Sequence, residues 1–356
     1  MSRFLDEKYR SLECYTPGEQ PQDRKYVKLN TNESPYPPSE EVINSIKDKD
    51  ISDLRLYSDP ECRVLRKKLA ERYGVNEGNI YLSNGSDDIL NFAFMAYCSD
   101  GKGVAFPDIT YGFYSVYAEL YRSDAQIIPL EDDFSIDPDK YCNISKTVVI
   151  ANPNAPTGRC LCVQDIERIV ATNKNNVVVI DEAYVDFGAE SCLPLIKKYD
   201  NLLIVRTFSK SRALAGARLG FAIASEVIIE DLNKIKFSTN PYNVNRLTLL
   251  AGAAAIDSDE YFSQNCKRIA ATREKTVLAL ESLGFYTVPT KANFIFAKHP
   301  DISGRDLYLK LKERGILIRH FSSPRISEFN RITVGSEEEM SIFLKTTKEI
   351  LEGANK

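Results

Sequence analysis

The sequence predicts an α/β fold with a mostly parallel central sheet flanked by helices, plus a smaller α+β domain. Two observations lead to this expectation. Continuous Val/Ile-rich runs recur between residues 79 and 224, and strands of this composition are buried on both faces. Helical segments separate several of these runs, which is the order typical of a parallel sheet with helices outside. After about residue 240 the order changes to short strands and helices of a second layer.

The length and composition bound the number of domains. The chain has 356 residues, of which 43% are hydrophobic, enough for two domains with sizeable cores. We expect residues 1–35 to form an N-terminal arm that belongs to the small domain. Residues 36–245 are expected to form the large domain that carries the site, and residues 246–356 the small C-terminal domain.

Charge and cysteine usage exclude several classes of protein. The net charge is −4 with charges mixed throughout, so no basic surface for nucleic acid is expected. No apolar run has the length of a membrane span and no signal-peptide core is present, which predicts a cytoplasmic protein without a membrane partner. The eight cysteines are scattered and there are only two histidines, so we expect no disulfide framework, no metal site and no histidine-based catalysis.

The elements of the large domain follow in order. Ser39 is expected to cap a helix that reaches Lys47, and the helix 61–73 is stopped by Gly74. The expected strands cover residues 79–82, 103–106, 125–130, 147–152, 177–181, 202–207 and 219–224. The expected helices cover residues 89–97, 111–120, 163–172 and 193–198.

The second layer contains fewer and shorter strands. The segment 245–256 is an Ala/Leu-rich helix, and 258–283 is a long amphipathic helix placed to bridge two domains. The remaining expected strands cover residues 285–288, 293–298, 316–321 and 331–334, and the remaining helices cover residues 304–314 and 337–351.

Polar or aromatic residues follow five of the expected strands. In open parallel sheets, ligands bind beyond the carboxyl ends of the strands. This rule selects the loops at residues 83–87, 107–111, 152–158, 181–184 and 207–210. The convergence of five such loops predicts one shared site.

The stretch 207–220 is the centre of this predicted site. Lys210 stands just past a buried strand, with Ser209 and Ser211 beside it and Arg218 eight residues on. A lysine in this setting suits a Schiff base with an aldehyde whose phosphate is held by the hydroxyls and the arginine. The alternative is a surface lysine in a polar loop.

Two further loops carry candidate anion and cation partners. Gly85 and Ser86 begin a helix, and backbone N–H groups at a helix start bind anions. Ser86 is expected to cap this helix and to donate to a phosphate, and a plain N-cap without a bound anion is the alternative. Asp181 follows four apolar residues, where a carboxylate needs a partner. A protonated pyridine nitrogen is one such partner, and capping of the next element is the alternative.

Aromatic, amide and arginine side chains complete the candidates. Tyr111 is placed to stack on a flat ring or to be a core residue. The loop 152–158 is held rigid by two prolines, with a cis bond as one option, and its amide side chains suit a phenolic oxygen. Arg319 and Arg331 are interpreted either as a pair that binds a substrate anion or as solvated surface charges. The Pro-rich segment 28–38 is a linker or an arm that covers the site.

Ten short motifs carry a resemblance over nearly the whole chain. Together they resemble the pyridoxal-phosphate enzymes of fold type I, the class I and II aminotransferases, and within them the histidinol-phosphate branch. The motifs are Tyr15-Thr-Pro-Gly18, Leu29-Asn-Thr-Asn-Glu33, Tyr57-Ser-Asp-Pro60, Asn84-Gly-Ser-Asp87, Pro107-Asp-Ile-Thr-Tyr-Gly112, Asn152-Pro-Asn-Ala-Pro-Thr-Gly158, Asp181-Glu-Ala-Tyr184, Phe208-Ser-Lys210, Leu214-Ala-Gly-Ala-Arg218 and Arg331-Ile-Thr-Val-Gly335.

The resemblance implies pyridoxal 5'-phosphate as the cofactor and assigns roles to individual residues. Lys210 is the implied Schiff-base lysine, Asp181 the partner of the pyridine nitrogen, and Tyr184 the partner of the phenolic oxygen. Tyr111 is implied to stack on the ring. The implied phosphate ligands and their turn are Gly85, Ser86, Asp87 through its backbone N–H, Ser209 and Arg218.

The resemblance also implies residues for the substrate and for a second subunit. Tyr57 is implied to reach the phosphate of the neighbouring subunit's cofactor, hence a homodimer with shared sites. The implied substrate-binding residues are Tyr15, Asn32, Arg319 and Arg331. The family commonly has Asn directly before Pro-Thr-Gly, where this chain has Ala155, so Asn154 is expected to take that role from one residue earlier.

The implied reaction converts L-histidinol phosphate and 2-oxoglutarate to imidazole acetol phosphate and L-glutamate in histidine biosynthesis. Two alternatives share the cofactor: an aromatic-amino-acid aminotransferase and a threonine-phosphate decarboxylase. A non-catalytic regulator built on this fold is a third. Such regulators carry a DNA-binding module, for which this chain has neither an extension nor a basic stripe.

Overall fold

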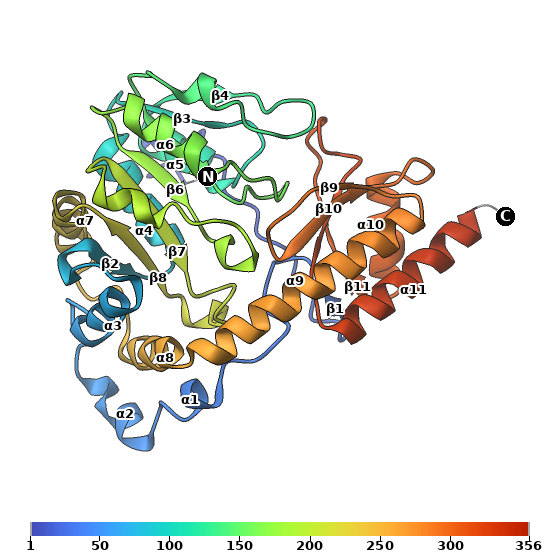
Figure 1. Ribbon diagram of the computed structural model, residues 1–356, viewed down its shortest axis with the longest axis horizontal. Helices are drawn as coiled ribbons and strands as arrows, with labels where there is room; N and C mark the ends of the chain where they lie inside the picture. Colours follow the sequence, from blue (N-terminus) through green and yellow to red (C-terminus); the bar gives the residue numbers. More distant parts are fainter. Residues whose placement is uncertain (1, 355–356) are drawn as a thin grey trace.

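The computed structural model describes residues 2–354, and its larger part is built on a seven-stranded sheet (Figure 1). The strand order is β2-β8-β7-β6-β5-β3-β4. Neighbouring strands are parallel except for β8, which is antiparallel to both β2 and β7. The predicted mostly parallel sheet is therefore confirmed. Its strands are β2 (Ile80–Ser83), β3 (Gly103–Pro107), β4 (Asp124–Ile128), β5 (Thr147–Ala151), β6 (Val178–Asp181), β7 (Leu202–Thr207) and β8 (Gly220–Ala224).

Alternate side chains of the central strands enter two different cores. On β6, Val179 packs with three helices, whereas Val178 and Ile180 pack on the opposite face with α6 (Val163–Thr172). Because Val and Ile fill both cores, the central strands appear in the sequence as continuous apolar runs. The three helices on the first face are α4 (Ser86–Tyr97), α5 (Phe113–Leu120) and α7 (Glu226–Thr239).

Helix α7 was missed in the sequence analysis, which assigned no element to residues 226–239. Its buried residues Ile228, Ile229, Leu232 and Lys236 recur at helical spacing, so the signal for a helix was readable in the sequence. The helical segment predicted over residues 193–198 is a 3₁₀ helix at Leu193–Lys197.

A third core lies beside β2, under α3 (Arg63–Tyr73) and α8 (Arg246–Asp257). Gly74 ends α3 in the left-handed region with φ of 64°, as predicted. Ser39 caps α1 by accepting the N–H of Val42 at 3.3 Å. The prediction that this helix reaches Lys47 is wrong, because two short helices form instead, α1 (Glu40–Ile43) and α2 (Asp48–Ser52).

The smaller part contains a four-stranded antiparallel sheet in the order β12-β13-β10-β9. Helix α9 (Asp259–Ser282) extends from the region of α8 to this sheet (Figure 1), as expected of a bridging helix. The other elements are β9 (Tyr286–Val288), β10 (Phe294–Lys298), β12 (Arg319–His320), β13 (Asn330–Thr333), α10 (Gly304–Glu313) and α11 (Glu337–Ala354).

The single strand predicted over residues 316–321 is divided into two. β11 (Ile316–Leu317) pairs in parallel with β1 (Val27–Lys28), whereas β12 pairs with β13. The buried Ile318 separates the two pieces and packs into the core of the small sheet. A strand that changes partner in this way cannot be recognised from its own apolar pattern.

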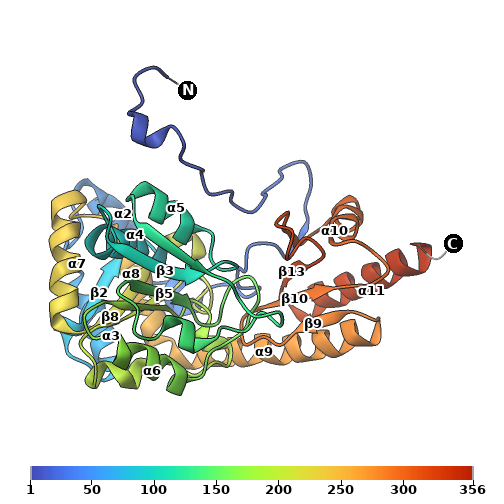
Figure 2. The same cartoon turned by 90° about the horizontal axis from the view of Figure 1, so that it is seen from above.

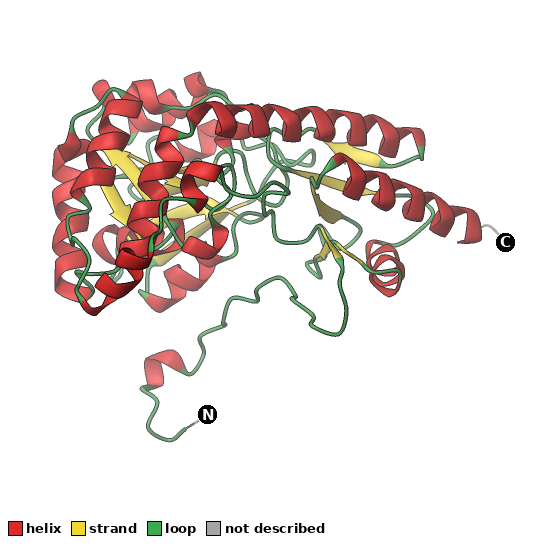
Figure 3. Ribbon diagram, turned by 90° about the horizontal axis from the view of Figure 1, so that it is seen from below, coloured by secondary structure: helices red, strands yellow, loops and turns green. Residues whose placement is uncertain are grey.

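The N-terminal segment before β1 runs along the outside of the molecule (Figure 2). It is almost entirely loop (Figure 3), apart from a 3₁₀ turn at Glu7–Tyr9. Arg24 ties it to the small part, because Nη2 donates to the carbonyl of Lys312 at 2.6 Å. The domain boundaries at residues 35 and 245 stay predictions. No helix within residues 2–354 is long and apolar enough to cross a membrane.

Candidate active site

The five loops selected from the sequence meet at one edge of the large sheet. Two antiparallel steps through β8 return β2 to the direction of β7, so β2, β3, β5, β6 and β7 all end at the same edge. Two adjoining cavities lie there. We call them the inner cavity, of about 410 Å³, and the outer cavity, of about 460 Å³. Five residues line both: Thr31, Tyr111, Ala155, Tyr184 and Lys210.

Lys210 stands where the two cavities join. Its Nζ donates to the carbonyl of Thr31 at 3.2 Å. Burial, reinforced by the nearby charge of Arg331, lowers the pKa of Lys210 to about 8. About a tenth of this amine is therefore unprotonated at pH 7, far more than for an ordinary lysine, and an amine must be unprotonated to act as a nucleophile or a base.

Asp181 ends β6 and lines the inner cavity with only 5% of its surface exposed. Its Oδ2 accepts the hydroxyl of Tyr114 at 3.0 Å, and its Oδ1 accepts the N–H of Ala183 at 3.1 Å. Burial raises the pKa of Asp181 to about 6 despite these bonds. No cation of residues 2–354 forms an ion pair with this carboxylate, so its remaining acceptor capacity is directed to the cavity.

The turn before α4 lies at the end of the inner cavity. Gly85 has φ of 86°, and a Cβ added to it would lie 2.8 Å from Nη2 of Arg218, so only glycine fits this approach. The prediction that Ser86 caps α4 is wrong. The N-cap residue is Gly85, which has no side chain to cap the helix. Asp88 Oδ2 accepts the N–H of Asn84 at 3.3 Å in the turn before the helix, and Ser86 lines the inner cavity.

The remaining predicted phosphate residues are close to this turn. Arg218 and Ser209 both line the inner cavity, and Arg218 Nη2 lies 2.8 Å from Oδ2 of Asp87. The hydroxyl of Tyr111 donates to the other oxygen of Asp87 at 2.7 Å. The side chain of Asp87 is thus occupied by the protein, which leaves its backbone N–H at the helix start for an anion.

Asn154 is not placed as predicted. Its Nδ2 donates to the carbonyl of Ile109 at 2.9 Å and to Oγ1 of Thr157 at 3.1 Å, and its Oδ1 accepts the hydroxyl of Thr110 at 2.8 Å. The side chain is 1% exposed and lines neither cavity, because these bonds turn it into the loop. Ala155 lines both cavities instead.

A different amide contacts Tyr184, the predicted partner of the cofactor's phenolic oxygen. Asn32 Nδ2 donates to the hydroxyl of Tyr184 at 3.0 Å. Asn32 lies in the left-handed region with φ of 57° and is fixed by Thr333, whose hydroxyl donates to Asn32 Oδ1 at 3.1 Å. The sequence placed Asn32 at the substrate, and the structure places it in the outer cavity and in contact with Tyr184.

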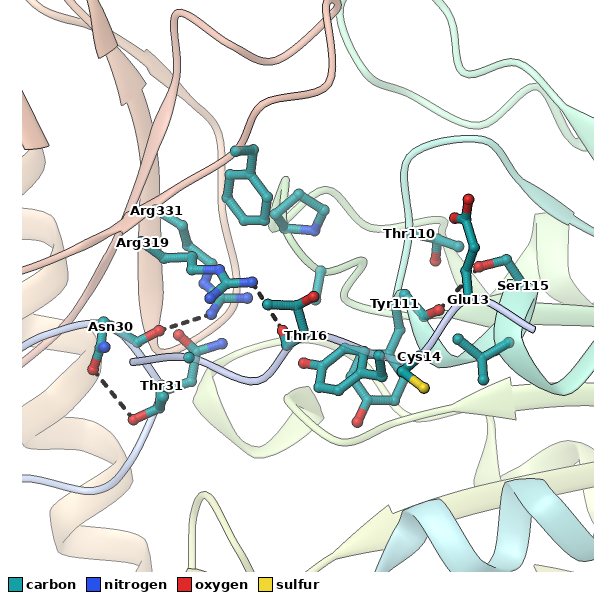
Figure 4. Close-up of a pocket in the computed structure, with 18 of the residues that line it drawn as sticks. Glu13, Cys14, Thr16, Asn30, Thr31, Thr110, Tyr111, Ser115, Arg319 and Arg331 are labelled. Atoms are coloured by element: carbon teal, nitrogen blue, oxygen red, sulfur yellow. Dashed lines mark hydrogen bonds between the residues drawn. The ribbon is translucent and has the colours of Figure 1, made fainter. Parts of the chain in front are cut away.

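The predicted arginine clamp forms one wall of the outer cavity (Figure 4). Arg319 and Arg331 are direct partners in the β12–β13 ladder. Arg331 donates to the carbonyl of Asn30 at 3.1 Å, and its buried Nε has no protein partner among residues 2–354. Arg319 donates to the carbonyls of Thr16 and Pro17, each at 3.1 Å, and so holds the arm over the cavity.

Tyr15 of the arm enters the outer cavity as predicted. Its ring stacks on Phe113 with the ring centroids 4.2 Å apart. Tyr57, in contrast, lines neither cavity of its own chain. It is 79% exposed and stacks on Tyr242.

The sequence analysis missed Tyr114, which contacts Asp181. It follows the predicted Tyr111 by three residues on a helix, and that spacing was a readable signal for a second tyrosine directed to the same side. No group of three or more residues suited to hold a metal occurs within residues 2–354, and the eight cysteines are all free.

Comparison with known proteins decides the family. The profile of "Aminotransferase class I and II" matches residues 24–346. The chain belongs to the class I and II aminotransferases. It is an enzyme that transfers amino groups between small molecules with pyridoxal phosphate, the cofactor of this family.

Two curated relatives cover almost the whole aminotransferase. The chain is 51% identical to the histidinol-phosphate aminotransferase of Brachyspira hyodysenteriae, with 99% of each chain covered. It is 48% identical to that of Clostridium acetobutylicum, with 99% and 100% covered. Among solved structures, the histidinol-phosphate aminotransferase of Sinorhizobium meliloti in complex with pyridoxal-5'-phosphate superposes with a TM-score of 0.89, at 22% identity and 99% coverage of each chain. This likeness confirms the fold.

The residues of the inner cavity fit pyridoxal phosphate. A buried carboxylate without a cation, Asp181, suits a protonated pyridine nitrogen. The hydroxyls of Ser86 and Ser209, the guanidinium of Arg218 and the start of α4 suit a phosphate. The lysine amine lies between these groups and the outer cavity.

Proposed function

We propose that this aminotransferase moves the amino group of L-histidinol phosphate to 2-oxoglutarate, yielding imidazole acetol phosphate and L-glutamate in histidine biosynthesis. The arrangement of two anion sites on either side of Lys210 carries the proposal. Ser86, Ser209 and Arg218 line the inner cavity, and the Arg319–Arg331 pair lines the outer one. A phosphorylated cofactor and a phosphorylated amine need such a pair of sites, and full-length relatives with this activity in their names support the assignment.

The roles of the inner residues follow from their chemistry. Pyridoxal phosphate supplies an aldehyde carbon and an electron-withdrawing ring when bound. Asp181 holds the ring nitrogen protonated, and Tyr184 donates to the phenolic oxygen while Asn32 donates to Tyr184. Tyr111 packs on the ring. Arg218 and the serine hydroxyls, with the N–H of Asp87, hold the phosphate.

Lys210 is the group that moves the proton. Lys210 would hold the aldehyde carbon of bound pyridoxal phosphate until the nitrogen of the amine displaces it, and its freed Nζ would then take the proton from Cα of the amine and carry it to the cofactor. Its lowered pKa, about 8, lets the neutral amine form at a modest cost in free energy. The arm and Tyr15 cover the outer cavity and exclude water from this step.

The outer residues hold the anionic end of both substrates in turn. Arg331 presents its unpartnered Nε, and Arg319 stands beside it. Guanidinium groups bind phosphate and carboxylate with the same geometry, so one pair serves histidinol phosphate and the oxo acid. Tyr15 assists on the phosphate.

We also propose a homodimer in the cytoplasm, in which Tyr57 reaches the cofactor phosphate of the partner subunit. Tyr57 is exposed, as are the neighbouring apolar side chains Ile51, Leu54 and Leu56, and a surface of this kind marks an interface. The mass in solution and Tyr57→Phe test this. We expect a dimer and about tenfold weaker binding of pyridoxal phosphate; a monomer, or unchanged binding, contradicts it.

The substrate assignment is tested by half-reactions without an oxo acid. The protein is loaded with pyridoxal phosphate, and its visible absorbance band is followed on adding histidinol phosphate, phenylalanine or threonine phosphate. We expect histidinol phosphate to bleach the band at far lower concentration than the others. Equal bleaching by phenylalanine indicates an aromatic aminotransferase. Release of carbon dioxide from threonine phosphate indicates the decarboxylase.

A further inference from the structure

Helix α5 and its flanks present a stripe of tyrosines to the site. Tyr111, Tyr114, Tyr117 and Tyr121 recur at helical spacing, and the hydroxyl of each donates to the framework around the inner cavity. Tyr111 and Tyr117 both bond to Asp87, at an oxygen of its carboxylate and at its carbonyl, and Tyr121 bonds to Asn91. Tyr114 alone reaches Asp181.

The side chain of Tyr114 is held firmly in place. It is fully buried, and Phe94, Phe106 and Tyr111 surround its ring with centroids 6.4, 6.1 and 5.7 Å away. Burial raises the pKa of Tyr114, so the hydroxyl keeps its proton and donates. Its 3.0 Å bond to Oδ2 of Asp181 is the only side-chain hydrogen bond to that carboxylate within residues 2–354.

Asp181 depends on this donor because burial and two neighbouring carboxylates oppose its charge. Burial, with the Asp87 and Glu182 carboxylates, raises the pKa of Asp181, whereas Tyr114 and the N–H of Ala183 lower it. A neutral carboxyl group would offer the pyridine nitrogen no negative charge, so loss of one donor weakens the partner of that nitrogen.

We propose that Tyr114 is a positioning residue that keeps Asp181 ionised and oriented toward the ring nitrogen of pyridoxal phosphate. This inference rests on the role proposed above for Asp181. Tyr114 lines neither the inner nor the outer cavity, so it acts through the carboxylate, and the ring nitrogen keeps its proton only while that carboxylate is an anion.

The test measures the ring nitrogen directly. Holoenzyme is prepared with pyridoxal phosphate labelled with nitrogen-15 in the ring, and the chemical shift of that nitrogen is followed against pH. In Tyr114→Phe we expect the nitrogen to lose its proton about one pH unit lower than in the unsubstituted enzyme, with about tenfold weaker binding of pyridoxal phosphate. In Tyr141→Phe, which also removes a buried hydroxyl but one without a protein partner, we expect no change.

A second substitution keeps the test decisive if Tyr114→Phe does not fold. Incorporation of 3-fluorotyrosine at position 114 makes the hydroxyl a stronger donor at nearly the same volume, and the titration is then expected to move to higher pH. An unchanged titration in the position-114 variants, with a changed one in Asp181→Asn, overturns the inference alone. Unchanged titrations in all of them overturn the role of Asp181 as well. An equal shift in Tyr141→Phe also overturns the inference.

Discussion

Asp181 and Glu182 are adjacent carboxylates at the end of β6, and they enter different surroundings on opposite sides of the sheet edge. Glu182 has a fully buried side chain that accepts Nε and Nη2 of Arg206 at 3.0 and 2.7 Å. It also accepts Oγ of Ser191 and the N–H of Cys192. Asp181 has one hydroxyl and one N–H, and no ion-pair partner among residues 2–354.

The comparison separates a carboxylate that stabilises the fold from one that is held ready for a ligand. The oxygens of Glu182 are satisfied within the protein, whereas burial raises the pKa of Asp181 to about 6. Buried polar groups that lack partners cost free energy. For Asp181 this cost arises at the position where we propose that the protonated pyridine ring binds.

The largest effect is expected at Lys210, which lines the same cavity as Asp181. Lys210→Ala removes both the attachment point of the cofactor and the proton carrier, so we expect turnover to fall by more than about 10³-fold with the fold retained. Steady-state transaminase assays and circular dichroism measure this. The exposed Lys197→Ala serves as the control and is expected to keep full activity. Transaminase activity retained in Lys210→Ala would refute the assignment.

The structural side of the comparison is tested by Glu182→Gln. Removing the charge of Glu182 from this buried pair leaves Arg206 with Asp186 as its remaining counter-charge, 3.3 Å from Nη1, and we expect the free energy of unfolding to fall by up to about 3–5 kcal/mol. Urea denaturation measures the change, and Glu190→Gln, at an exposed position, provides the matched control. A variant as stable as the parent would show that Glu182 does not stabilise the fold as the comparison requires.

Asp181→Asn is expected to have the opposite effect on the protein without cofactor. The folded-state pKa is about 6 against 3.8 for the free side chain, so the folded chain binds more protons in this window. The free energy of unfolding of the parent therefore falls as pH rises from about 4 to 6. At pH 7 this loss is at most about 3 kcal/mol, and Asp181→Asn avoids it. Thermal unfolding should show a higher Tm for Asp181→Asn than for the parent at pH 7, and no such difference below pH 4. A lower Tm of the variant at pH 7 would contradict the prediction.

The smallest expected effect is a pH dependence of cofactor attachment. Only the unprotonated amine of Lys210 reacts with an aldehyde, so the rate of attachment to the apoprotein should rise with pH and level off above about 8. Rapid-mixing absorbance at the visible band of the bound cofactor measures this rate. A midpoint near the ordinary lysine value would mean that burial and Arg331 do not lower the pKa of Lys210 in solution.

The sequence was sufficient for the sheet and for the loops that meet at its edge. The Val/Ile runs of β5, β6 and β7 reflect burial on both faces, and the residues after each strand were found from the rule for parallel sheets. These signals are local, since each depends on a few consecutive residues.

The features that were missed depend on contacts between distant residues. Tyr114 donates to a carboxylate 67 positions along the chain. The amide of Asn154 is turned away from the site by the carbonyl of Ile109, 45 positions earlier. The division of the strand at 316–321 depends on β1. The spacing of Tyr114 from Tyr111 indicates the side of the helix on which it lies, but no local pattern identifies these distant partners.

The pairing of β1 with β11 also has a consequence for the order in which the chain acquires its structure during translation. Val27 has its partner at Ile316, so the first strand emerges from the ribosome long before its partner exists. Thr31, four residues after Val27, supplies the carbonyl that receives Nζ of Lys210. The nascent large sheet can therefore form early, whereas the wall around its lysine closes only when synthesis has passed residue 317.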